Sequence, residues 1–187
     1  MDPQAALERL REGNRRFVDR KSQWSQQGWR PGLANGQSPF AVVLGCSDSR
    51  APAELVFDQG LGALFVIRIA GHVVAPSGVG SVEFATAQFD TRLVIVMGHT
   101  HCGAVEATVR AIQGTEGAPS KNMRSITDRI RPHVEPLVQN GALTGEALLR
   151  EGVRANIAAS VNALRHGSAI LEELILSQRI VVVGAEY

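Results

Sequence analysis

Four short and predominantly apolar runs constrain the fold of this chain most strongly. They span residues 40–44, 64–69, 92–97 and 179–183, and they are rich in β-branched side chains. An uninterrupted apolar run of this length is typical of a strand that is buried on both faces, as in a parallel sheet. We therefore expect four strands that pair mostly in parallel.

Helical patterns separate these runs. They cover residues 52–57, 79–89 and 103–113 between the strands, and residues 123–138 and 152–176 before the last strand. Strands that alternate with helices predict βαβ units. The expected fold class is therefore α/β, with a mostly parallel central β-sheet flanked by helices.

The length of 187 residues and an apolar content of 44% fit a single domain with a substantial core. We divide it into an N-terminal helix and arm at 1–38 and an α/β core at 39–187. The first helix, at residues 3–18, places Leu7, Leu10, Asn14 and Phe17 on one face. That face packs either on a partner subunit or on its own domain, and the sequence favours neither.

Charge and hydropathy exclude several classes of protein. The formal net charge is +1, so no strong nucleic-acid or anionic-membrane surface is expected. No apolar run approaches the ~20 residues of a membrane span. The first residues carry no signal-peptide pattern, which predicts a cytoplasmic protein whose two cysteines bind metal rather than form a disulfide.

Both cysteines follow a strand-like run directly. Cys46 comes after the first run, and His99 and Cys102 come after the third. The carboxyl ends of parallel strands meet at one edge of a sheet, where ligands bind in open α/β folds. Two thiolates and an imidazole, with a fourth ligand, make a zinc site, and the site is catalytic if the fourth position opens to water.

Asp48, two residues after Cys46, has two possible roles. It is either the fourth zinc ligand, which closes the site, or the bidentate partner of Arg50, which leaves a position for water. His72, after the second run, either shuttles protons or hydrogen-bonds a loop. His101, between two expected ligands, is expected to point away from the metal.

These residues resemble the bacterial members of the β-class carbonic anhydrases. The resemblance rests on Cys-Ser-Asp-Ser-Arg at 46–50 and Gly-His-x-x-Cys-Gly at 98–103, and it extends over nearly the whole chain. It implies zinc-dependent reversible hydration of CO₂ to bicarbonate and a proton, by attack of hydroxide on zinc. It also implies a homodimer or homotetramer in which the N-terminal helix packs on the partner subunit.

The resemblance assigns roles to individual residues. The zinc ligands are Cys46, His99 and Cys102, and an Asp48–Arg50 dyad controls the fourth position. Substrate-pocket roles fall on Gln37, which reaches the pocket across the dimer interface, on Phe65, Phe84 and the Gly103 N–H.

Val43 stands three residues before Cys46, where members with an inhibitory bicarbonate site carry tryptophan, so an open site is expected. The family usually continues beyond position 187 into another edge strand. Other readings of the sequence are a carbonyl sulfide or carbon disulfide hydrolase on the same scaffold, a non-catalytic zinc-stabilised module, and a thiol redox protein.

Overall fold

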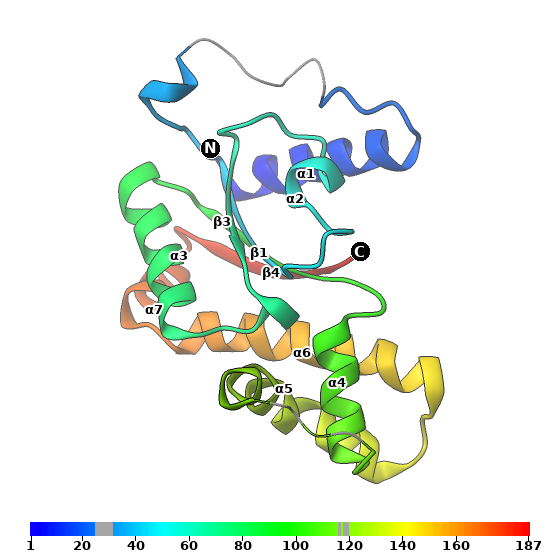
Figure 1. The fold of residues 1–187 in the computed structure, drawn as a ribbon. Coiled ribbons are helices and arrows are strands. Elements are labelled where there is room, and N and C mark those ends of the chain that lie inside the picture. The colour runs from blue at the N-terminus through cyan, green and yellow to red at the C-terminus, as the bar shows by residue number, and fades with distance from the viewer. Residues whose placement is uncertain (25–31, 116, 118–119) are drawn as a thin grey trace.

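A parallel four-stranded sheet forms the centre of the molecule (Figure 1). A computed structural model describes residues 1–24, 32–115, 117 and 120–187. The strands are β1 (Ala41–Gly45), β2 (Leu64–Arg68), β3 (Leu93–Gly98) and β4 (Val181–Glu186). Their order is β2-β1-β3-β4 and every neighbouring pair is parallel, which confirms the predicted sheet.

The last strand lies two to three residues further along the chain than its apolar run predicts. The backbone N–H groups of Arg179 and Ile180 still bond to the carbonyl of Leu174 at the end of the preceding helix. The ladder with β3 then continues to the pair Gly98 and Glu186. Pairing with β3, rather than apolar content, therefore decides where this strand ends.

Seven α-helices surround the sheet within the described residues. They are α1 (Pro3–Val18), α2 (Ala53–Val56), α3 (Pro76–Phe89), α4 (Gly103–Ile112), α5 (Lys121–Asn140), α6 (Gly145–His166) and α7 (Ala169–Leu176). Two short 3₁₀ segments are η1 (Leu33–Asn35) and η2 (Ala70–His72). Figure 1 shows α1 and α2 on one side of the sheet and the other helices on the opposite side.

The helical stretch predicted at 152–176 is wrong in its bounds. Helix α6 begins at Gly145, and Gly152 lies within it, facing Val105 and Val134 of neighbouring helices. Helix α6 ends at His166, with Gly167 as its C-cap residue. The hydroxyl of Ser168 then accepts a hydrogen bond from the Leu171 N–H and caps the start of α7. Gly152 therefore allows α6 to pack closely against its neighbouring helices and does not mark a helix terminus.

Alternate residues of the strands enter two separate cores. Val42, Leu44, Val94 and Val96 face the layer of α3 to α7, whereas Ala41, Val43, Leu93 and Ile95 face α1 and α2. All eight are buried. This burial on both faces is the physical origin of the apolar runs that form β1 and β3, whereas the edge strands β2 and β4 are only partly buried.

Helix α1 packs on its own domain through a close approach to α2. Gly13 is buried, and a Cβ atom there would lie 1.8 Å from the Phe57 carbonyl oxygen, so only glycine fits. Asn14 Nδ2 donates to the Val56 carbonyl at 3.0 Å. Helix α1 therefore packs on its own domain, which was one of the two alternatives, and its contact with a partner subunit stays a prediction.

A buried ion pair between Arg16 of α1 and Asp58, which follows α2, stabilises the packing of these two helices. Asp58 is fully buried and accepts hydrogen bonds from Arg16 Nε at 2.6 Å, Ser22 Oγ at 2.5 Å and the Gln23 N–H at 2.8 Å. Burial alone raises the pKa of Asp58, but the bonds from Ser22, Arg16 and Gln23 outweigh it and hold the pKa below its usual value. This carboxylate therefore stabilises the fold only while it is ionised.

Replacing Arg16 by methionine is expected to lower the free energy of unfolding by roughly 2–4 kcal/mol, because it leaves Asp58 buried without its counter-ion. The matched control is Arg15→Met, since Arg15 pairs with Glu8 at the surface, and its expected effect is within about 0.5 kcal/mol. Urea unfolding measures both. The difference should shrink as the pH falls below about 4, where Asp58 of the unfolded chain takes up a proton, and should disappear below the lower pKa of Asp58 in the folded protein. Equal effects of the two substitutions would contradict this account.

The arm predicted at 21–38 is described only in part, because residues 25–31 lie outside the described residues. Its final section returns to the sheet, where the Ser38 N–H donates to the Gly62 carbonyl and the Phe40 N–H to the Ala63 carbonyl. Among the described helices, none has the length and apolar character needed to cross a membrane.

Candidate metal centre

Cys46, His99 and Cys102 meet at the carboxyl edge of the sheet. Cys46 follows β1, His99 follows β3, and Cys102 is the N-cap residue of α4. One ligand atom from each lies within 4.8 Å of the other two, and all three residues are buried. The structure thus brings together the three residues that the sequence predicts as metal ligands.

The imidazole of His99 is oriented for coordination. Its Nδ1 lies 2.9 Å from the Thr100 carbonyl oxygen, so Nδ1 carries the proton and Nε2 presents a lone pair. Nε2 is buried and has no hydrogen-bond partner among the described residues. A buried ring nitrogen without a partner, facing two sulfur atoms, fits a zinc ion with two thiolate ligands and one histidine ligand.

The two thiols differ in their ionisation when no metal is bound. The Cys102 thiol donates toward Cys46, and His99 and the Gly71 N–H add to this, so the pKa of Cys46 is lowered despite burial. The negative charge of Cys46, together with burial, raises the pKa of Cys102. Contact with Cys46 also raises the pKa of His99, against the effect of its burial.

Zinc binding is therefore expected to release at least one proton at neutral pH, because the Cys102 thiol, whose pKa is raised, must be deprotonated to bind the metal. Isothermal titration calorimetry in buffers of different ionisation enthalpy counts these protons. The sign follows from the raised pKa values: zinc affinity should fall steadily as the pH is lowered from 8 to 6. An affinity that does not change over that range would contradict this assignment of protons.

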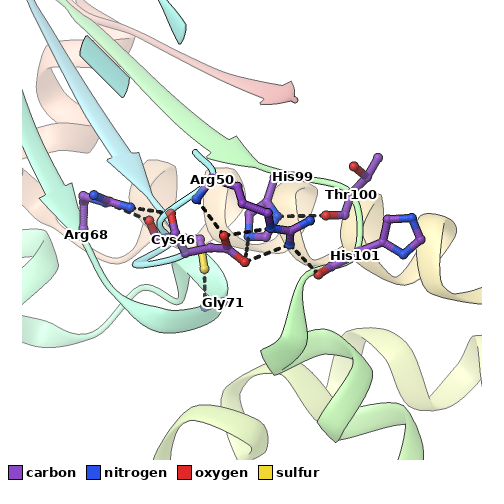
Figure 2. A network of polar contacts seen from close by, with 8 residues as sticks. Cys46, Arg50, Arg68, Gly71, His99, Thr100 and His101 are labelled. Atoms are coloured by element: carbon purple, nitrogen blue, oxygen red, sulfur yellow. Dashed lines mark hydrogen bonds and ion pairs between the residues drawn. The ribbon is translucent and has the colours of Figure 1, made fainter. Parts of the chain in front are cut away.

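Arg50, labelled in Figure 2, holds the carboxylate of Asp48 through two side-chain hydrogen bonds. Arg50 Nε and Nη2 donate to the two Asp48 oxygens at 3.0 and 2.8 Å, and the Arg50 N–H donates to Oδ1 at 2.9 Å. Arg50 Nη2 also donates to the His101 carbonyl at 3.0 Å, which joins the loops after β1 and β3. The Arg50 side chain and N–H keep the pKa of Asp48 well below its usual range.

Asp48 Oδ2 lies 3.9 Å from His99 Nε2, so the carboxylate borders the metal centre. Arg50 binds both oxygens of the Asp48 carboxylate. Asp48 can therefore coordinate zinc only if its pairing with Arg50 is broken. Of the two roles that the sequence leaves open for Asp48, this geometry favours the partner of Arg50.

Arg68 supports the site, although the sequence analysis did not single it out. At the end of β2, its Nε donates to the Cys46 carbonyl at 2.9 Å and its Nη2 to the Asp48 carbonyl at 2.5 Å (Figure 2). An arginine inside an otherwise apolar run, one strand away from Cys46, is the signal that could have found it.

A buried polar network lies behind Cys46. The Gly71 N–H donates to Cys46 Sγ at 3.3 Å, and Asn156 Nδ2 donates to the Gly71 carbonyl at 2.7 Å and to His72 Nε2 at 2.9 Å. His72 is fully buried, and burial lowers its pKa to about 4, so it is neutral at pH 7. His72 is thus part of a hydrogen-bonded loop, one of its two predicted roles. Asn156 carries no sequence signal, because it lies within an ordinary helical pattern.

Of the four residues with predicted substrate-pocket roles, Gly103 adjoins the ligand Cys102, whereas Gln37 lies at the other end of the sheet. Gln37 is exposed at the amino-terminal edge of the sheet, beside Gly62. Phe65 pairs in register with Val42, and its ring lies 6.2 Å from that of Phe84, centroid to centroid. Phe84 is 52% exposed.

Two further predictions concern the loop before α4. Gly103 is the first residue of α4, directly after Cys102; it is exposed, and open space surrounds the position of its missing Cβ. Figure 2 shows the exposed His101 ring directed away from His99 and Cys46, as the sequence analysis predicts.

Comparison with known proteins places the chain among characterised relatives. The family model described as "Carbonic anhydrase" matches residues 41–187. "Carbonic anhydrase 2" of Mycobacterium tuberculosis is 39% identical over 189 residues, covering 100% of this chain and 88% of the relative. "Carbonic anhydrase" of Mycolicibacterium smegmatis is 37% identical over 188 residues, covering 100% of this chain and 89% of the relative.

Solved structures agree with this fold. The β-carbonic anhydrase CcaA is 26% identical and aligns with a TM-score of 0.71 over 98% of this chain and 83% of its own. A tetrameric β-carbonic anhydrase of Sordaria macrospora, 22% identical, aligns with a TM-score of 0.73 over 84% of this chain and 79% of its own. With its Cys-His-Cys centre and these relatives, the chain belongs to the β-carbonic anhydrases, a family of zinc enzymes that interconvert CO₂ and bicarbonate.

Proposed function

We propose that this chain catalyses the reversible hydration of CO₂ at a zinc ion held by Cys46, His99 and Cys102. The observation that carries the proposal is the pairing of Asp48 with Arg50, which occupies both carboxylate oxygens beside a three-ligand centre. Three protein ligands leave one tetrahedral position for water, which is the arrangement of catalytic rather than structural zinc sites.

Zinc held by these three residues would act as a Lewis acid and would lower the pKa of water in the open position. The ionised Asp48, which borders the centre, would accept a hydrogen bond from the resulting nucleophile and orient it toward the carbon of CO₂. Arg50 fixes Asp48 in that position through the pairing described above. The Gly103 N–H, at the positive end of α4, is available to bind an oxygen of bicarbonate.

Because two of the zinc ligands are thiolates, the rate of hydration is expected to be higher at alkaline pH. They cancel the formal charge of the zinc ion, so the water it polarises has a pKa above the ~7 of a three-histidine centre. Asp48 is not the source of this pH dependence, because Arg50 keeps its pKa far below neutrality. Hydration should therefore rise as the pH increases through 8.

The proposed active form is a homodimer or a homotetramer. Gln37 lies at the opposite edge of the sheet from its own metal centre, so it can bind substrate only in the site of another copy. Phe84 offers that copy an exposed apolar surface, next to Phe65. The proposed location is the cytoplasm, where a reducing environment keeps Cys46 and Cys102 available as ligands.

Hydrolysis of carbonyl sulfide or carbon disulfide is the alternative on the same centre, because all three substrates are linear, apolar and electrophilic at carbon. Measuring ¹⁸O loss from labelled bicarbonate and sulfide release from carbonyl sulfide, on the same zinc-loaded sample, separates these activities. Rapid ¹⁸O loss with slow sulfide release is the expected result. Sulfide release without ¹⁸O loss would assign the chain to the hydrolases.

A further inference from the structure

The turn that follows β2 has an unusual backbone. Within Ala70–His72, φ is +69° at Gly71 and +44° at His72. A positive φ is unstrained for glycine but uncommon for histidine, and it persists only where the surroundings hold it. This turn presents the Gly71 N–H to Cys46 Sγ at 3.3 Å, within the buried centre.

Helix α6 supplies the groups that hold this turn. Asn156 uses both hydrogens of its amide, one for the Gly71 carbonyl at 2.7 Å and one for His72 Nε2 at 2.9 Å. One helical turn later, Ser160 Oγ donates to the His72 carbonyl at 3.1 Å. Both side chains are buried, with 2% and 5% of their surface exposed.

The turn is also confined by packing. A Cβ atom at Gly71 would lie 2.9 Å from Ala104 Cβ and 2.9 Å from Ile130 Cδ1, so α4 and α5 close on it from two sides. Packing restricts the volume available, but it does not orient a peptide group. The backbone bond from the His72 N–H to the Ile69 carbonyl at 2.8 Å closes the turn, and the directional contacts from outside it are made by Asn156, Ser160 and Cys46.

An N–H group aimed at a thiolate withdraws charge from the sulfur and fixes the direction of its lone pairs. We propose that Asn156 is a positioning residue for the metal centre: by holding the Ala70–His72 turn, it keeps the Gly71 N–H on Cys46 and thereby sets zinc affinity and electron donation from that sulfur. The inference rests on the zinc centre of the proposed function, and it adds a group that touches neither metal nor substrate.

The test compares Asn156→Leu with Asn162→Leu, an exposed asparagine on the same helix. Leucine matches asparagine in the number and branching of its side-chain heavy atoms but is larger, and Asn156 borders a cavity of about 180 Å³ that gives the new side chain room. Chelator competition measures zinc affinity, and cobalt substitution reports on the sulfur through its charge-transfer band. We expect Asn156→Leu to weaken zinc binding about 10–100-fold and to move the cobalt band to longer wavelength, whereas Asn162→Leu leaves both unchanged.

Ser160→Ala is the second variant, because Asn156→Leu leaves two buried groups without a partner and can fail to fold. It removes only the bond to the His72 carbonyl, and it should shift affinity and band in the same direction by a smaller amount. If the folded Asn156→Leu and Ser160→Ala proteins bound zinc with wild-type affinity and kept the wild-type cobalt charge-transfer band, the inference would be overturned. These readouts do not use CO₂, so an inactive wild-type protein would count against the proposed function and not against the role of Asn156.

Discussion

Cys46→Ala is expected to bind no zinc at micromolar metal concentrations and to hydrate CO₂ no faster than buffer. The loss in rate should be on the order of 10⁶-fold, the lower end of enzymatic rate enhancements. The reason is geometric: among the described residues, the metal-ligand group consists of Cys46, His99 and Cys102, and without Cys46 only two protein ligands remain. Metal analysis after gel filtration and stopped-flow hydration measure the two losses.

Ser47→Ala is the matched control for that variant. Ser47 is exposed and adjacent to Cys46, so its replacement tests whether a substitution in this loop is by itself harmful. One zinc per chain and wild-type hydration are expected for the control. If Cys46→Ala kept one tightly bound zinc per chain, the metal would lie elsewhere and the centre described here would be wrong.

Asp48→Asn is expected to keep its zinc and lose hydration activity by about 10²–10³-fold, the effect of removing one oriented polar group from a transition state. An amide cannot accept both Arg50 bonds, because its nitrogen is a donor facing another donor. The nucleophile therefore loses the acceptor that orients it. Stopped-flow assays on samples of equal zinc content measure the effect.

The chain provides a close control in Asp90→Asn. Asp90 pairs with Arg92 two residues later, as Asp48 pairs with Arg50, but it lies before β3 at the other end of the strand. Loss of that exposed pair should leave hydration unchanged. Equal losses in Asp48→Asn and Asp90→Asn would show that the effect is on stability and not on the metal centre.

The sequence predicts those features of the fold that depend on local pattern. The apolar runs at 40–44 and 92–97 specify β1 and β3 because both faces of these strands are buried. The cysteines and His99 are predictable as a cluster because parallel strands end at one edge. Proline at position 3 and the carboxylate of Asp2 specify the start of α1, where the Gln4 N–H donates to Asp2 at 2.9 Å.

Features that depend on contacts distant in sequence could not be predicted. Asn156 acts on Gly71 from 85 residues away, and no local pattern distinguishes it from other asparagines in helices. The end of β4 is decided by its ladder with β3.

Stopped-flow CO₂ hydration as metal-free protein is titrated with zinc tests the central claim most directly. The predicted result is a rate that increases in proportion to bound zinc, reaches its maximum at one zinc per chain, and is higher at pH 8.5 than at pH 7. A protein that binds one zinc per chain and hydrates CO₂ no faster than buffer at either pH would contradict an open, catalytic centre.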